Sequence, residues 1–165
     1  MTKLTAITNE DMKSISDLYR QTWKKEDPSV EERFRRHATY EGYKGLILKS
    51  NEEPVGFVYG YTSQKGQYYN ELLRKALSNT EQSQWLEDCL EVVELVVLPE
   101  ERRSGRGALL MTKLMEEVKH KTAILTTQVD NYAARGLYEK LGWHVVKEPF
   151  FPNTEEAYVV LGKKL

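Results

Sequence analysis

The sequence has few of the features by which secreted or membrane-spanning proteins are recognised. Cys89 is the only cysteine, so the chain cannot form an internal disulfide. No run approaches the roughly 18 apolar residues of a membrane span, and the first residues contain no apolar segment typical of a signal peptide. We therefore expect a cytoplasmic protein with no membrane partner.

An excess of charge of either sign is also missing. Lys and Arg number 24 and Asp and Glu number 25, which gives a formal net charge of -1. Such a chain exerts no general attraction on nucleic acid, so we expect no nucleic-acid partner. His37, His120 and His144 stand alone, without a second ligand at the spacing of a metal site, and we expect no metal.

The sequence does contain enough apolar material for a core. With 165 residues, of which 40% are hydrophobic, it has the size and composition of a globular protein. We expect a single domain over residues 1–165. A homodimer is compatible with this composition, although no feature of the sequence requires one.

The first part of the chain predicts two helices followed by a β-hairpin. Polar capping residues with acidic neighbours, followed by apolar residues three or four apart, indicate helices over residues 9–23 and 28–36. Residues 45–50 and 55–62 have the composition of strands. The short polar segment 51–54 between them is typical of a hairpin connection.

A polar segment, Ser63 to Glu87, precedes a strongly apolar one. Part of it has helical spacing, at Tyr69, Leu72, Leu73 and Leu77, and we interpret the whole segment as an inserted helical arm or lid. The following run, EVVELVVL at residues 91–98, is nearly continuous and rich in β-branched residues. It predicts a central strand that is covered on both faces.

In the rest of the chain, segments with the apolar spacing of a helix alternate with segments that have the pattern of a strand. Its pattern predicts, in order, a helix over 108–120, a strand over 122–128, a helix from Asp130 or Asn131 to Leu141, and strands over 143–147 and 156–162. Gly142 can adopt the left-handed conformation that ends a helix. The expected fold class is α/β (α+β), a central mixed sheet flanked by helices.

The sequence PEERRSGRG joins the central strand to the next helix. Gly105 and Gly107 allow the backbone to turn sharply, so that several N–H groups can converge on one ligand. The positive charges of Arg102, Arg103 and Arg106 stand beside the positive end of a helix macrodipole, an arrangement that favours a bound anion. We interpret this turn as a site for a pyrophosphate.

The same turn has a plainer interpretation, which the residues alone leave open. Its arginines can form ordinary ion pairs with Glu100 and Glu101 on a solvated surface. Two other nucleotide motifs are excluded: a P-loop requires Gly-Lys-Ser/Thr, and a dinucleotide-binding fingerprint requires a third small residue where Leu110 stands.

Two segments carry a family resemblance. Arg102-Arg103-Ser104-Gly105-Arg106-Gly107 is similar to the Arg/Gln-x-x-Gly-x-Gly/Ala motif by which GCN5-related N-acetyltransferases (GNAT) bind acetyl-CoA. Residues 131–143 resemble the second signature of that superfamily, with Trp143 where phenylalanine is usual. The resemblance extends from about Glu91 to Leu165, and the first half of the chain matches only in its order of helix, helix, strand and strand. The arm from Ser63 to Glu87 departs from the family.

The resemblance implies a fold, a co-substrate and its contacts. Family members have a mixed sheet in which the central strand splays from its neighbour, and coenzyme A enters there. The residues that the resemblance assigns to acetyl-CoA are Leu95, Val96, Val97, Arg102, Arg103, Ser104, Gly105, Arg106, Gly107, Ala108, Asn131, Ala134 and Tyr138.

The transfer reaction also requires acid and base groups. Glu91 and Glu94 are candidates for the base that takes a proton from the acceptor amine; they point to opposite faces of a regular strand, and the sequence does not choose between them. Tyr138 matches the tyrosine by which the family protonates the departing thiolate, although a tyrosine beside Leu137 and Leu141 can equally be a core residue. Asn131 can contact the co-substrate or only cap its helix.

The functional prediction is an N-acetyltransferase that moves the acetyl group of acetyl-CoA to an amine of an unidentified acceptor by direct attack on the thioester. The alternative is a non-catalytic sensor or regulatory module that binds acyl-CoA and transfers nothing.

Overall fold

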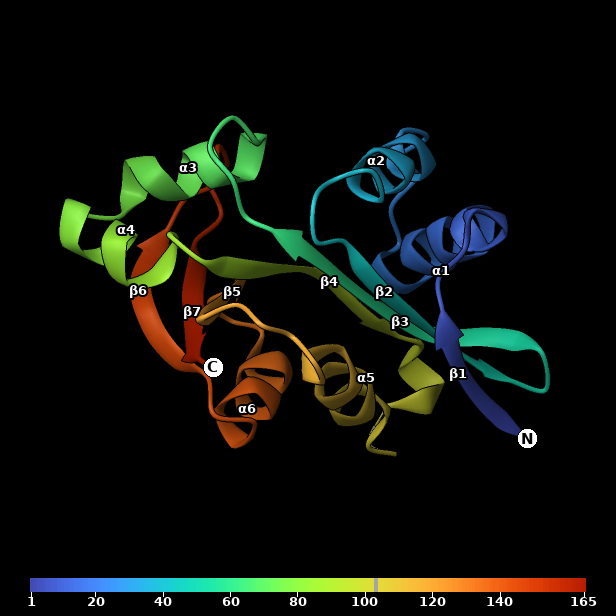
Figure 1. The fold of residues 1–165 in the computed structure, drawn as a ribbon. Coiled ribbons are helices and arrows are strands. Elements are labelled where there is room, and N and C mark those ends of the chain that lie inside the picture. The colour runs from blue at the N-terminus through green and yellow to red at the C-terminus, as the bar shows by residue number, and fades with distance from the viewer. Residues whose placement is uncertain (103) are drawn as a thin grey trace. The chain divides into compact units, whose positions relative to one another are not determined.

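The computed structural model describes residues 1–102 and 104–165, and Arg103 of the predicted anion-binding turn lies outside them (Figure 1). Its strands are β1 (Thr2–Ala6), β2 (Lys44–Ser50), β3 (Glu53–Thr62), β4 (Cys89–Val97), β5 (Thr122–Gln128), β6 (His144–Phe150) and β7 (Tyr158–Lys164). Its α-helices are α1 (Met12–Trp23), α2 (Val30–His37), α3 (Tyr68–Ala76), α4 (Asn79–Trp85), α5 (Arg106–Met115) and α6 (Tyr132–Lys140), with short 3-10 helices η1 (Asn9–Asp11) and η2 (Pro99–Glu101).

The strands form one mixed sheet in the order β1-β2-β3-β4-β5-β7-β6. The pair β4 and β5 is parallel, whereas β1 with β2, β2 with β3, β5 with β7 and β6 with β7 are antiparallel. The predicted fold class, a mixed sheet with flanking helices, is confirmed. None of the helices in the described part of the chain is long and apolar enough to cross a membrane.

Contacts between residues divide the chain into two compact units. The first consists of Met1–Tyr61 and Val93–Val118, and the second of Thr62–Val92 and Lys119–Leu165. Each unit has a hydrophobic cluster of its own. The single domain over residues 1–165 stays a prediction.

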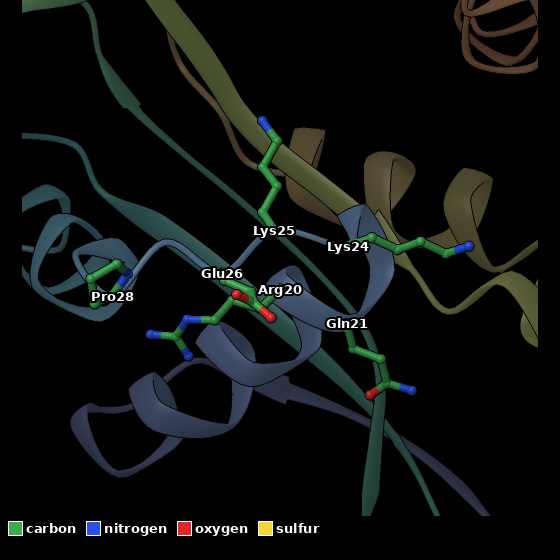
Figure 2. A pocket seen from close by; sticks show the side chains of 6 residues that line it. All are labelled: Arg20, Gln21, Lys24, Lys25, Glu26 and Pro28. Carbon is green, nitrogen blue, oxygen red and sulfur yellow. The ribbon is translucent and has the colours of Figure 1, made fainter.

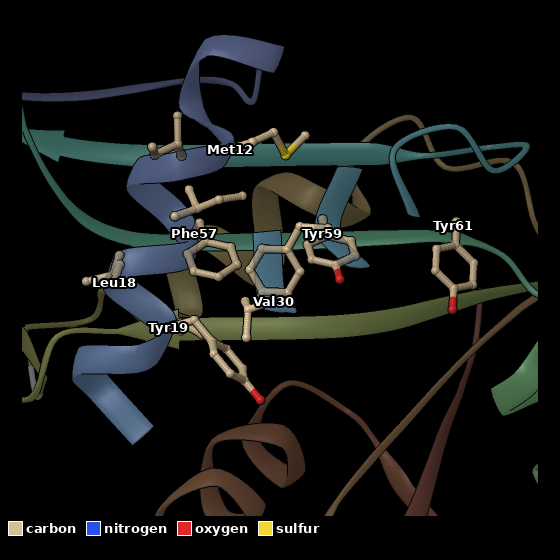
Figure 3. Packing of buried hydrophobic residues seen from close by; sticks show 11 residues of the cluster. Met12, Leu18, Tyr19, Val30, Phe57, Tyr59 and Tyr61 are labelled. Carbon is tan, nitrogen blue, oxygen red and sulfur yellow. The ribbon is translucent and has the colours of Figure 1, made fainter. Parts of the chain in front are cut away.

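Aromatic rings dominate the core of the first unit. Phe34 of α2 makes edge-to-face contacts with Tyr19 of α1 and with Phe57 and Tyr59 of β3, at centroid separations of 5.5, 5.8 and 5.4 Å. Figure 3 shows Tyr19, Phe57 and Tyr59 within this core. Since each such ring pair contributes about 0.5–1.5 kcal/mol beyond its burial, they hold α1 and α2 against β3.

The predicted hairpin is confirmed. Ser50 of β2 pairs with Glu53 of β3, and the two residues between them, Asn51 and Glu52, have φ angles of 51° and 69°. Positive φ at both positions of a two-residue connection gives the backbone twist that antiparallel strands need.

Helix α5 is shorter than predicted. It ends at Met115 rather than His120, and Glu117 adopts a left-handed φ of 63°. Lys44 of β2 donates from Nζ to the carbonyl oxygen of Leu114 at 2.9 Å, which satisfies the helix C-terminus with a positive charge. The apolar spacing continues past Met115, but this cap ends the helix there.

In the second unit, the arm contains two helices where the apolar spacing predicted one. A capping box between Ser78 and Glu81 starts α4. Leu73, Leu77 and Leu86 of the arm are buried in the core of this unit. The arm is therefore packed as part of the unit.

Two further contacts fix the arm to the sheet of the second unit. The ring of Trp85 lies so close to Gly162 that a Cβ atom at position 162 would be 2.5 Å from its Cζ3. The hydroxyl groups of Tyr69 and Thr126 are 2.6 Å apart.

Candidate active site

The backbone around Gly105 has the conformation that the motif predicts. Gly105 is the N-cap of α5 and has a left-handed φ of 79°, and nothing lies within 4 Å of the position a Cβ atom would take. The first amides of a helix have no partner within the helix, so those of Arg106, Gly107 and Ala108 face outward at the positive end of the dipole. Gly107 is the second residue of α5 and is not part of the left-handed turn.

Only some of the described charged residues of this turn form ion pairs with one another. Arg106 forms an ion pair with Glu101, with 3.0 Å between Nε and Oε2. Arg102 donates from Nε to the carbonyl oxygen of Val97 at 3.3 Å, and its guanidinium lies 5.9 Å from the centre of the Trp23 ring. Arg106 therefore forms the ordinary ion pair expected of a solvated turn. Arg102 instead lies over the ring of Trp23.

A second basic surface lies at the end of α1. Arg20, Lys24 and Lys25 line an open pocket there, and Figure 2 shows their side chains extending in different directions. Arg20 is already bound, with Nη1 3.0 Å from Asp17 and Nε donating to the carbonyl oxygen of Asp27. Because these cations do not converge, the surface is a solvated charged face.

The parallel pair formed by β4 and β5 is short. Its register covers Cys89–Glu91 and Thr122–Ile124, and it ends there although both strands continue. In the described part of the chain, Leu95, Val96 and Val97 thus lie on a stretch of β4 beyond this pairing. This is the segment that the resemblance assigns to acetyl-CoA.

Glu94 lies on β4 in the first unit and is half-buried. Loss of hydration raises the pKa of its carboxyl group to about 7, while the positive charges of Arg33 and Lys25 lower it. Arg33 is held beside Asp27 at 3.6 Å and over the ring of Tyr19 at 5.5 Å. The carboxyl group therefore changes charge near neutral pH, close to the positive charges of Arg33 and Lys25.

Glu91 lies in the second unit in a different environment. Its side chain is buried, and its Oε1 has no hydrogen-bond partner among the residues that the structure describes. Burial raises the pKa of this carboxyl group to about 8. At neutral pH, Glu91 is mainly protonated and uncharged.

We expect the substitution Glu91→Gln to flatten the pH dependence of stability. Between about pH 4.5 and 8 the folded chain keeps the Glu91 proton that the unfolded chain loses, so the free energy of unfolding decreases as the pH rises. Removing this proton should reduce that slope by about 1.4 kcal/mol per pH unit. Urea unfolding at pH 5, 6.5 and 8 measures the slope.

Glu139→Gln, at an exposed position of α6, is the matched control and should leave the slope unchanged. An equal slope in the wild type and in Glu91→Gln would show that Glu91 ionises at the same pH in the folded and unfolded chains.

Helix α6 carries the remaining predicted residues. The side chain of Asn131 accepts a hydrogen bond from the backbone N–H of Ala134 at 3.2 Å, which confirms the predicted cap. Tyr138 is buried, and its ring centre is 6.1 Å from that of Trp143. Contacts of Asn131, Ala134 and Tyr138 with acetyl-CoA stay predictions.

The first unit contains Glu94, the end of β4 and the Gly105 turn, which follow one another along the chain from β4 to the start of α5. Glu91 and the residues of α6 belong to the second unit. Sequence reasoning did not consider Arg33, because only the packing of α2 brings it near Glu94. Among the described residues, no group of three or more His, Cys, Asp or Glu side chains could hold a metal ion.

Comparison with known proteins gives a consistent result. Residues 11–143 match the model of the acetyltransferase (GNAT) family. An N-alpha-acetyltransferase of Saccharolobus solfataricus is 35% identical over 75 residues, a segment that spans 42% of this chain and only 45% of that relative.

Two solved structures share the fold. The ribosomal-protein-S18-alanine N-acetyltransferase of Escherichia coli has a TM-score of 0.72 at 18% identity, over 99% of this chain and 94% of that one. The PaiA N-acetyltransferase of Thermoplasma acidophilum, in complex with coenzyme A, has a TM-score of 0.63 at 15% identity, over 100% and 99% of the two chains. Since the family model matches most of the chain, this protein belongs to the acetyltransferase (GNAT) family.

Proposed function

We propose that the chain transfers the acetyl group of acetyl-CoA to a primary amine by direct attack on the thioester. The amine nitrogen forms a bond to the carbonyl carbon, the carbon–sulfur bond breaks, the nitrogen loses a proton to a base, and the thiolate takes one from an acid. The observation that carries this proposal is the left-handed Gly105 turn, which presents the first amides of α5 directly after the strand that bears Glu94.

The binding of acetyl-CoA is assigned to two parts of this segment. The amides of Arg103 to Ala108 take the pyrophosphate, because a helix N-terminus favours negative charge. The backbone of Leu95 to Val97 takes the pantetheine and polarises the thioester carbonyl. A preorganised donor at such an oxygen typically contributes about 3 kcal/mol to transition-state stabilisation. A protein of this fold has been solved in complex with coenzyme A, which supports coenzyme A as the ligand.

Glu94 is the proposed base. A general base is most effective when its pKa lies near the working pH, and the pKa of Glu94 is about 7. Glu91 has the higher pKa, about 8, and the shift is attributed to burial alone, so at pH 7 less of it is in the form that accepts a proton. Tyr138 is the proposed acid.

An α-amino group is the acceptor class that we propose. A reference α-amine has a pKa of about 7.7–8.0, close to that of Glu94, whereas a lysine amine has about 10.4 and is neutral in only roughly one molecule in a thousand at pH 7. A curated relative is named as an N-alpha-acetyltransferase, which points to the same class.

Release of the coenzyme A thiol, measured with a panel of amines, tests the proposal. The panel contains peptides with a free N-terminus, N-terminally blocked peptides with a lysine, a polyamine and an aminoglycoside. We expect turnover with the free N-termini only. Turnover with lysine alone would reject the α-amine, and acetyl-CoA binding without turnover of any amine would favour the sensor.

Replacing Tyr138 by Phe should lower kcat by roughly 100-fold or more, since the thiolate would leave without a proton donor. The dissociation constant for acetyl-CoA should not change, because the phenyl ring still packs against Trp143. Steady-state kinetics and calorimetry measure the two quantities. Tyr132→Phe, on the exposed side of the same helix, is the control, and an unchanged kcat in Tyr138→Phe would remove Tyr138 from the reaction.

A further inference from the structure

The arm of the second unit holds a pocket that takes no part in the proposed reaction. It has a volume of about 710 Å³ and lies among α3, α4 and the residues before α3. Arg74 and Lys65 supply positive charge to its lining, and Glu87 supplies the one negative charge. Among the described residues that line it, only Leu86 is apolar; the remaining uncharged ones carry amide or hydroxyl groups.

Arg74 is held in place by neutral groups. Its Nε donates to the side-chain oxygen of Asn70 at 2.7 Å, and its Nη1 donates to that of Gln82 at 3.2 Å. Asn70 is fully buried and donates in turn to the hydroxyl of Ser63 at 2.7 Å. A guanidinium has five N–H donors, so these two contacts leave others for a ligand.

No carboxylate lies within ion-pairing distance of Arg74 in the described part of the chain. Elsewhere in the same unit, Arg135 pairs with Glu148 at 2.9 Å, which is the usual arrangement. The charge of Arg74 is therefore oriented but not neutralised. A partly buried arginine of this kind favours an anion from outside the protein.

The frame around Arg74 is already ordered. Gln82 donates from Nε2 to the carbonyl oxygens of Arg74 and Leu77 at 2.8 and 2.9 Å, which ties α4 to the end of α3. Leu73, beside Arg74 in the sequence, is buried in the core. Binding here would require little further ordering of side chains, and such preorganisation improves affinity.

We propose that this pocket binds a small polar molecule that carries a carboxylate or phosphate group, with Arg74 as the anchor. The planar guanidinium matches either oxyanion through two parallel N–H donors. Lys65 adds a second cation, and the amide and hydroxyl lining suits a polar body. The site is distinct from the Gly105 turn and does not depend on the proposed acetyl transfer.

Nuclear magnetic resonance of the arginine Nε–Hε groups tests the proposal, because the hydrogen bond to Asn70 slows exchange of the Arg74 proton. The protein without acetyl-CoA is titrated at constant ionic strength with succinate and, separately, with inorganic phosphate. Succinamide is the neutral control. We expect a saturable shift of the Arg74 signal with at least one anion. The anion that binds with the higher affinity identifies the ligand as a carboxylate or a phosphate.

Variants distinguish binding in the pocket from general attraction of anions to the positive charge of the protein surface. In the variants, binding is followed by the backbone N–H signals of Gln82 and Ser83, which line the pocket. Arg74→Gln should weaken anion binding at least tenfold, whereas Lys75→Gln, an exposed lysine on the same helix, should leave it unchanged. Asn70→Asp places a carboxylate beside the retained arginine and should also weaken binding at least tenfold. Thermal unfolding checks that each variant folds. No saturable shift with either anion, equal binding of succinamide, or wild-type affinity in Arg74→Gln and Asn70→Asp would overturn the proposal.

Discussion

The substitution Gly105→Asp should lower the affinity for acetyl-CoA at least 100-fold. It places a carboxylate where the pyrophosphate is proposed to bind, and two tenfold steps correspond to about 2.8 kcal/mol. The new Cβ atom meets nothing within 4 Å, so no clash contributes to the loss. Calorimetric titration of the purified variant measures the change directly.

Two controls separate charge from backbone conformation. Gly105→Asn has nearly the same shape without the charge and should retain most of the affinity, because Asn tolerates left-handed φ. Gly66→Asp introduces the same residue at another exposed glycine of positive φ, 96°, outside the turn, and should bind acetyl-CoA normally. Equal affinity of Gly105→Asp and the wild type would show that the pyrophosphate lies elsewhere.

Replacing Glu94 by Gln should reduce kcat/KM by roughly 100- to 1000-fold at pH 8, as removal of a general base does. In the wild type, kcat/KM should fall as the pH decreases below about 7, because Glu94 becomes protonated and cannot accept the proton of the amine. This limb should be missing in Glu94→Gln. The ionisation of the acceptor amine gives a separate limb, which both proteins should share.

The cations around Glu94 provide a sharper test of the same assignment. Arg33 and Lys25 lower its pKa, and Tyr19 and Tyr59 also interact with it electrostatically. Arg33→Gln should therefore move the acidic limb to higher pH. If kcat/KM of Glu94→Gln still fell below about pH 7, the base would be another group. The same pH profile of Glu91→Gln then shows whether that group is Glu91.

The segment from β4 to α5 could be predicted because its signals are local. A nearly unbroken run of β-branched residues predicts a strand that is buried on both faces. Gly105, at the start of a helix, can adopt a left-handed φ without help from distant residues. The cap formed by Asn131 is equally local, since the side chain bonds an amide three residues away. For the same reason, the capping box of Ser78 and Glu81 could have revealed α4.

Elements stabilised by distant partners could not be predicted in this way. β1 is short and mostly exposed, and it exists because Leu4 and its neighbours pair with β2. The end of α5 depends on Lys44, and the environment of Glu94 depends on Arg33. None of these pairs is close in sequence, so no local pattern connects them.

The way the arm is packed bears on whether this segment can move as a lid. To swing outward, the arm would have to expose Leu73, Leu77 and Leu86, at about 1.5–3 kcal/mol for each side chain. The sum, roughly 5 kcal/mol or more, makes an open arm rarer than about one molecule in a thousand. Catalytic cycles should then proceed without a gating motion of this segment. The segment that the sequence predicted as an arm or lid is therefore a fixed part of its unit.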